Sequence, residues 1–245
     1  MKLLVCVSKT PETTTKVSFT AGNTEFNTSG VQYIMNPYDE WYSLVRAVEL
    51  KEEVAGSKVT LINVGPASND SILRKGLAIG ADQALRVDGE ASSAYYVAAQ
   101  IAKYAKGMDI VFTGKETIDY NGAEVGAILA ELLDLPFISF AVDLKMEGNV
   151  ATVTREIEGG KEILKVQPPF VLSAAKGMAE QRIPNMRGIM QAKKKPLVVR
   201  PAAEMSDPVS IVSYELPISK SAVKLIDPEN MDELVRLLHE EAKVI

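Results

Sequence analysis

Short apolar runs alternate with amphipathic stretches along the first part of the chain. Residues 2–7 and 58–64 are largely apolar, which is typical of strands buried on both faces of a sheet. Helical spacing follows Asn36-Pro37, where Asn36 can cap a first turn that Pro37 suits. This alternation predicts βαβ units and a parallel sheet. The expected strands are 2–7, 58–64, 84–87 and 109–113, and the expected helices are 36 to about 56, 68–79, 92–106 and 123–133.

The pattern changes after Leu135-Pro136, where short β-rich runs are joined by glycine-containing turns. Gly148-Asn149 and Gly159-Gly160 are typical of hairpin connections. The runs expected to be strands are 137–145, 150–157, 162–166 and 170–174. A proline-punctuated stretch and a last helix over 229–243 follow, without the bulk for a core of their own. We therefore expect an α/β domain over 1–200 with a β-hairpin insert, and a C-terminal arm over 201–245 that wraps around this domain or a partner.

Charge, apolar runs and the absence of several motifs argue against some classes of function. A net charge of −5 argues against general coating of nucleic acid, and no apolar run approaches the ~20 residues that span a bilayer. The first apolar run is too short for a signal peptide, which favours the cytoplasm. Cys6 and His239 are the only residues of their kinds, and no HExxH, GxSxG or Walker-type motif occurs. We expect neither catalytic residues nor a metal site.

The stretch Gly114-Lys115-Glu116-Thr117-Ile118-Asp119-Tyr120-Asn121-Gly122 directly follows an expected parallel strand. Ligands bind where loops leave the carboxyl ends of such strands, and backbone N–H groups near a helix start can hold a phosphate. Asn36 to Asp39 and Val64 follow or end other expected strands, and Tyr38 could stack on a ring. The spacing matches neither the dinucleotide fingerprint nor a P-loop. An ordinary strand–helix connection therefore stays the alternative to a nucleotide site.

Residues 181–200, which we call the basic segment, oppose the acidic balance of the chain. The segment, QRIPNMRGIMQAKKKPLVVR, contains six cationic residues and no acidic one, with Ile183, Met186, Ile189 and Met190 between them. Lysine runs are usually only solvated, but flexible apolar neighbours favour a surface that contacts another protein. We expect the segment to bind a large, negatively charged partner.

Taken together, these motifs resemble the β subunits of electron transfer flavoproteins. The resemblance covers nearly the whole chain. The motifs that carry it, in order, are LLVCV (3–7), MNPYDEW (35–41), NVGP (63–66), LRKGLAIGAD (73–82), FTGKETID (112–119), REIEGGKEIL (155–164) and IPNMRGIMQAKKKPL (183–197).

The resemblance implies an obligate heterodimer with an α subunit that holds the redox-active FAD. Such a flavoprotein accepts electrons from dehydrogenases, for example the acyl-CoA dehydrogenases of fatty acid oxidation, and passes them to a quinone oxidoreductase. The β subunit has an α/β fold like that of the adenine nucleotide α-hydrolases. It holds an AMP without a redox role, and the protein lies in the cytoplasm, or in the mitochondrial matrix of a eukaryote.

The resemblance also implies which residues act. The implied AMP contacts are Cys6, Asn36, Pro37, Tyr38, Asp39, Val64, Gly114, Lys115, Glu116, Thr117, Ile118, Asp119, Asn121, Gly122, Ala123, Glu124 and Val125. Residues 181–197 correspond to a recognition loop that docks on dehydrogenases, with Ile183 where the family usually has a leucine anchor. The implied docking residues are Arg182, Ile183, Pro184, Asn185, Met186, Lys193, Lys194 and Lys195. The C-terminal arm would reach across to the α subunit.

Two departures keep alternatives open. The sequence reads Ile118-Asp119-Tyr120-Asn121 where IDGD or IDDD is common, and PNMRGIM is longer than the usual PNIM. One alternative is an electron-bifurcating flavoprotein, which binds a second FAD in place of AMP and oxidises NADH. The other, from another class, is a nucleotide-binding regulator that resembles universal stress proteins, without a flavin.

Overall fold

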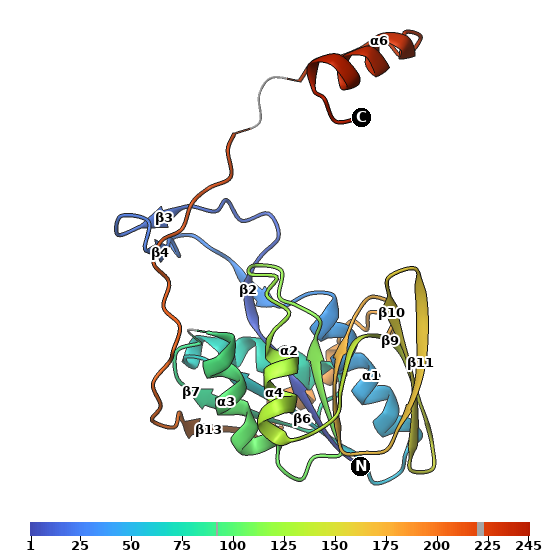
Figure 1. Ribbon diagram of the computed structural model, residues 1–245. Coiled ribbons are helices and arrows are strands. Elements are labelled where there is room, and N and C mark those ends of the chain that lie inside the picture. The colour runs from blue at the N-terminus through green and yellow to red at the C-terminus, as the bar shows by residue number, and fades with distance from the viewer. Residues whose placement is uncertain (92, 220–222) are drawn as a thin grey trace. The chain divides into compact units, whose positions relative to one another are not determined.

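The computed structural model describes residues 1–91, 93–219 and 223–245 and divides into two units. The larger unit, Met1–Val17 with Asn27–Val212, contains a nine-stranded sheet in the order β11-β10-β9-β12-β8-β1-β6-β7-β13 (Figure 1). Every neighbouring pair is parallel except those of β10, which runs antiparallel to β9 and β11. The strands are β1 (Lys2–Cys6), β6 (Lys58–Val64), β7 (Gln83–Asp88), β8 (Ile110–Gly114), β9 (Phe137–Glu147), β10 (Val150–Ile157), β11 (Gly160–Val166), β12 (Phe170–Ala174) and β13 (Leu197–Pro201).

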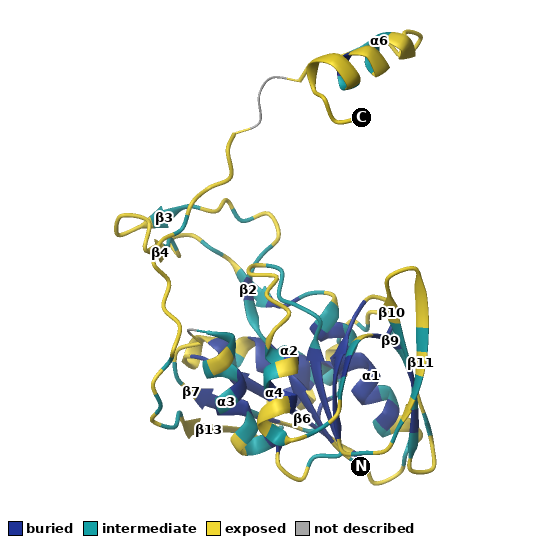
Figure 2. Cartoon of the chain, viewed as in Figure 1, coloured by how far each residue is buried: buried dark blue, intermediate teal, exposed yellow. Residues whose placement is uncertain are grey.

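The central strands are apolar throughout because both faces of the sheet are covered. Leu3 and Val5 of β1 belong to the hydrophobic cluster that includes α1 and α2, whereas Leu4 belongs to the cluster that includes α3 and α4. Successive side chains of a strand point to opposite faces, so a strand between two helical layers needs no polar face. Figure 2 shows this burial along the central strands. The helices are α1 (Asp39–Glu53), α2 (Asp70–Ile79), α3 (Ala94–Ala105) and α4 (Val125–Leu133).

The predicted α/β fold, with a mostly parallel sheet and an antiparallel hairpin, is confirmed. The hairpin strands are part of the central sheet, since β9 pairs with β12 and β12 pairs with β8. The edge strand β13 was not predicted, because the sequence around it is proline-punctuated and the strand is mostly exposed. Its register is set by pairing with the distant β7. The expected helix start at Ser92 lies outside the described residues; α3 itself is capped by Ser93.

The basic segment contains a helix where the sequence predicted a loop. Helix α5 (Met186–Ala192) begins after Asn185, whose side chain accepts a hydrogen bond from the Gly188 N–H at 2.8 Å. Asparagine at a helix start is a recognised cap, so the signal was present in the sequence. A short ladder, β2 (Lys9–Pro11) with β5 (Tyr33–Met35), and a 3₁₀ turn at Ala67–Asn69 complete this unit.

The smaller unit joins Ser18–Phe26 to Ser213–Ile245. Strands β3 (Phe19–Thr20) and β4 (Glu25–Phe26) form a small antiparallel hairpin. The Tyr214 ring stacks on Phe19 at 4.8 Å between centroids, and the Tyr214 N–H donates to the Asn23 carbonyl. The last helix, expected over 229–243, is α6 (Met231–Arg236) followed by a π-helical turn at Leu237–Glu241. Within the described residues, no helix has the length and apolarity to cross a membrane.

Candidate functional site

Three parallel neighbours, β8, β1 and β6, bring their carboxyl ends to one edge of the sheet. In this register Cys6 lies beside Ile62, and Val5 lies beside Phe112. The predicted ligand residues Cys6, Val64 and Gly114 therefore end adjacent strands. Burial raises the pKa of the Cys6 thiol, so this side chain is a neutral packing residue. Open α/β sheets bind ligands at this kind of edge.

Asn36 does not cap α1, contrary to the prediction. The residue before the helix is Tyr38, and no side chain caps this helix start. Asn36 is instead completely buried; its Nδ2 donates to the Glu116 carbonyl, and its Oδ1 accepts from the Ile118 N–H, both at 3.1 Å. One side chain thereby satisfies two backbone groups of the loop after β8 and ties that loop to the start of α1.

Gly114 allows β8 to end directly against α1. A Cβ atom at this position would lie 2.7 Å from the Glu40 Cγ atom and 3.1 Å from the Glu40 backbone nitrogen. A larger residue would therefore push the two elements apart. Tyr38 precedes α1 with a φ of 63°, a rare conformation for an aromatic residue, and leaves its ring 58% exposed. Strain of this kind is concentrated at functional sites.

Residues 121–125 form a candidate anion site. Asn121 and Ala123 adopt left-handed backbone conformations, with φ values of 51° and 54° on either side of Gly122. Left-handed residues within a turn can aim successive N–H groups toward one point. Helix α4 starts immediately afterwards at Val125, and no side chain caps its first turn. Its free N–H groups and the positive end of its dipole favour a phosphate.

Glu40, which is not among the predicted ligand residues, is buried at this edge. Its carboxylate oxygens accept hydrogen bonds from the Ser8 N–H at 2.6 Å and the Ser8 hydroxyl at 2.7 Å. Burial raises the pKa of Glu40 to about 8; the Ser8 hydrogen bonds oppose this shift, and the nearby Asp119 and Asp39 add to it. The signal in the sequence was its place beside Asp39 in the MNPYDEW motif.

The raised pKa of Glu40 predicts a pH dependence of stability. Between pH 4.5, the ordinary value, and about pH 8, the folded chain keeps a proton that the unfolded chain has released. The free energy of unfolding should therefore fall as pH rises through this window. Denaturant unfolding at the two ends should show a smaller fall for Glu40→Gln than for the wild type. Glu131→Gln, at an exposed position on α4, is the control. Equal falls in all three proteins would refute the assignment.

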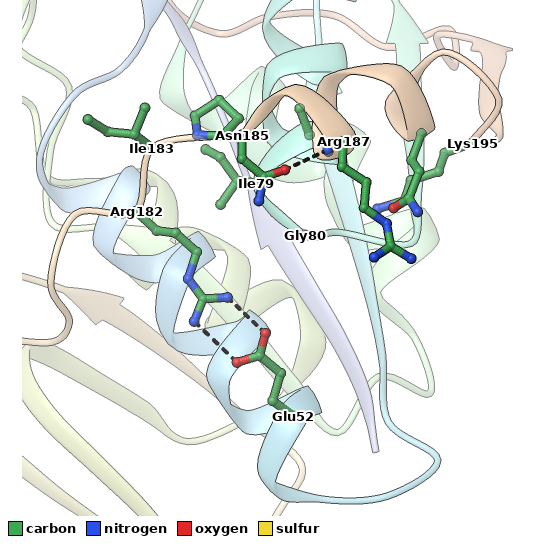
Figure 3. A pocket seen from close by; sticks show the side chains of 12 residues that line it. Glu52, Ile79, Gly80, Arg182, Ile183, Asn185, Arg187 and Lys195 are labelled. Carbon is green, nitrogen blue, oxygen red and sulfur yellow. Dashed lines mark hydrogen bonds and ion pairs between the residues drawn. The ribbon is translucent and has the colours of Figure 1, made fainter.

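The basic segment lies on a different surface, beside α1 and α2. The Trp41 Nε1–H donates to the Arg182 carbonyl at 3.2 Å, and the Arg182 guanidinium forms a two-pronged ion pair with Glu52 (Figure 3). Ile183 points away from this ion pair and is 80% exposed. A hollow of about 420 Å³ lies next to it. Its lining comprises Glu52, Ala78, Ile79, Gly80, Arg182, Ile183, Pro184, Asn185, Arg187, Gly188, Gln191 and Lys195.

The cations of the basic segment fall into two groups. Lys195 Nζ donates to the Leu77 and Ala81 carbonyls at 2.9 and 2.6 Å, at the carboxyl end of α2. With Arg182 already paired, these two charges are engaged within the chain. Lys193 and Lys194 are exposed, as are Asn185 and Met186, whereas Pro184 is partly covered. The structure thus gathers the predicted nucleotide residues at the strand ends and the predicted docking residues on a second surface.

Comparison with known proteins identifies the family of the chain. The family described as "ETF: Electron transfer flavoprotein domain" matches residues 24–205. The chain is 34% identical to the electron transfer flavoprotein subunit beta of Bacillus subtilis (strain 168), over 100% of both chains. It is 33% identical to that of Syntrophomonas wolfei, covering 94% of this chain and 91% of the relative. It is 32% identical to that of Mus musculus, covering 100% and 99%. This chain therefore belongs to the electron transfer flavoprotein β-subunit family.

Proposed function

We propose that this chain binds AMP at the carboxyl edge of β8, β1 and β6, and that it pairs with an α subunit that holds FAD. The heterodimer takes electrons from dehydrogenases such as acyl-CoA dehydrogenases and delivers them to a quinone oxidoreductase. The redox chemistry belongs to the flavin, so this subunit needs a nucleotide pocket, a subunit interface and a docking element. The observation that carries the proposal is the double hydrogen bond of Asn36 to the loop after β8, which ties the segment before α1 to that loop.

The residues at this edge fit a mononucleotide. The turn through Gly122 and Ala123, followed by the uncapped start of α4, offers backbone N–H groups to a phosphate, whereas the Asn121 N–H donates to the Thr117 carbonyl. Backbone donors are needed because the loop itself is acidic at Glu116 and Asp119. Lys115 is paired with Glu116 at 2.7 Å, so its charge is partly neutralised. The exposed Tyr38 ring offers a flat apolar surface to a base.

The basic segment supports the docking function. Ile183 is 80% exposed, and Lys193 and Lys194 of the same segment are exposed as well. A small apolar anchor supplies contact energy, whereas surrounding charge raises the rate of association with an acidic partner. A carrier must bind and leave several partners in turn, so a compact anchor with a charged surround suits it better than a large apolar face.

The C-terminal arm supports pairing with the α subunit. Many of the described residues from Val209 onward carry exposed apolar side chains; the most exposed are Val212, Ile218, Val223 and Leu225. An extended chain with this pattern cannot bury its apolar surface by itself, which indicates a partner. We propose that the arm binds the α subunit.

Truncation after Val212 tests the pairing. Co-expression of this chain with its genomic α partner should give a stable heterodimer that contains FAD, and removal of Ser213–Ile245 should reduce co-purification by about tenfold or more, because the apolar contacts of the arm are lost. The matched control replaces the ion-paired charges of α6, Glu233 and Arg236, with Gln and keeps the arm. Equal recovery of the heterodimer with and without the arm would refute the role of the arm.

A further inference from the structure

The part of the basic segment at and after the end of α5 is attached to α2. Arg74 Nη1 donates to the Ala192 and Lys195 carbonyls, each at 2.7 Å. The two acceptors lie at and just after the carboxyl end of α5, where helical carbonyls lack intrahelical partners. A guanidinium can satisfy both because its donors are held in a fixed plane. Arg74 therefore ties the carboxyl end of α5 to α2.

The neighbouring residue of α2 contacts the tryptophan that holds the start of the segment. The Lys75 ammonium lies 4.5 Å from the centre of the Trp41 ring, and the Trp41 Nε1–H donates to the Arg182 carbonyl. Trp41 is only 5% exposed, so its indole is held firmly within the core of the unit. The residue before Ile183 is thus held by Trp41 of α1, and Lys75 of α2 contacts the ring of that tryptophan.

Gly188 brings the middle of the segment against the same helix. A Cβ atom at this position would lie 2.4 Å from the Ala78 carbonyl oxygen, a distance that no side chain can tolerate against backbone. The Gly188 N–H donates a hydrogen bond to the Asn185 side chain. The close approach of α5 to α2 therefore depends on the absence of a side chain at position 188.

Lys195 joins the part of the basic segment after α5 to the carboxyl end of α2. Its ammonium donates to the Leu77 and Ala81 carbonyls at the end of α2, while its own carbonyl accepts from Arg74. The carbonyls at the carboxyl end of α5 thus accept hydrogen bonds from Arg74 of α2. The carbonyls at the carboxyl end of α2 accept hydrogen bonds from Lys195, which follows α5. Breaking one of these hydrogen bonds weakens the others, because Lys195 takes part in both sets.

We propose that Arg74 and Gly188 are positioning residues for partner docking: they hold α5 on α2 so that Ile183 and the exposed lysines of the basic segment meet a partner as a preformed surface. This inference rests on the proposed docking function. A preformed surface loses less conformational entropy on binding than a mobile loop. Neither residue reaches the partner in this account, and both act through the placement of α5.

The test is steady-state reduction of the complete heterodimer by an acyl-CoA dehydrogenase, with KM for the flavoprotein and kcat measured separately. Arg74→Ala removes two charge-assisted hydrogen bonds and should raise KM about tenfold, with kcat and flavin content unchanged. Gly188→Ala should raise KM without any change of charge. Arg74→Lys keeps the charge and can reach one carbonyl, so its KM should be intermediate. Arg155→Ala, which removes the Arg155–Glu162 ion pair from the hairpin strands, is the control and should behave as wild type.

A second measurement separates positioning from general stability. Amide hydrogen exchange in residues 183–195 should accelerate in Arg74→Ala while exchange in the central strands stays as in the wild type. In a protein that already carries Ile183→Ala, Arg74→Ala should raise KM by a smaller factor than it does alone, because the anchor that it displaces is already missing. Unchanged KM in Arg74→Ala and Gly188→Ala, with a raised KM in Ile183→Ala, would refute the inference alone. Unchanged KM in Ile183→Ala as well would refute the proposed docking function itself.

Discussion

Ile183→Ala is expected to raise the KM of an acyl-CoA dehydrogenase for the flavoprotein by about tenfold or more, while flavin content stays unchanged. Anchors of an interface commonly contribute about 2 kcal/mol or more, and each 1.4 kcal/mol corresponds to a factor of ten. Ile183 is 80% exposed, so its truncation leaves no cavity in the chain. Steady-state or stopped-flow reduction of the heterodimer measures the effect.

Ile163→Ala is the matched control for this prediction. Ile163 is also an isoleucine with high exposure, but it lies on the edge strand β11 and not in the basic segment. Its truncation should leave reduction kinetics unchanged. A wild-type KM for Ile183→Ala, or an equal increase for both variants, would show that Ile183 is not the anchor.

The second large effect is expected at Asn36. Asn36→Ala should leave the heterodimer with markedly less than one AMP per molecule, since it leaves the Glu116 carbonyl and the Ile118 N–H without their shared partner. Unsatisfied buried groups cost about 1–3 kcal/mol each, and the loop that forms one wall of the site should become mobile. Chromatography of the nucleotides released on denaturation gives the AMP content.

Two further variants control the Asn36 result. Asn36→Asp keeps an oxygen that can accept from Ile118 but loses the donor to Glu116, so its AMP content should be intermediate. Asn149→Ala changes an exposed asparagine in the hairpin turn between β9 and β10 and should retain AMP fully. Full AMP content in a folded Asn36→Ala heterodimer would contradict the assignment of the site.

The sheet could be predicted because its signals are local. Residues 58–64 are apolar on both faces, and the structure forms β6 over these residues. The strand β13 could not be predicted in the same way, because its exposed residues carry no burial pattern and only pairing with β7 defines it. Helix α5 had a capping signal at Asn185, but a segment with glycine and six cations resembled a loop more closely.

Side-chain roles were harder to predict than strand ends. Asn36 before a proline has the sequence signature of a cap, and only the folded chain brings it within 3.1 Å of a loop 80 residues away. The lysine run gave no indication that Lys195 turns inward while Lys193 and Lys194 stay exposed. These differences arise from long-range contacts, which a linear pattern does not encode.

Membership of the flavoprotein family also disfavours the stress-protein regulator, which had depended on the nucleotide fold alone.

The nucleotide content of the purified heterodimer tests the central claim most directly. The complete protein, co-expressed with its α subunit, should release one FAD and one AMP per heterodimer when it is denatured, and NADH should not reduce its flavin. Two FAD per heterodimer without AMP, together with flavin reduction by NADH, would contradict the AMP assignment and establish the bifurcating alternative. A chain that purifies with neither an α subunit nor a flavin would contradict the electron-carrier account as a whole.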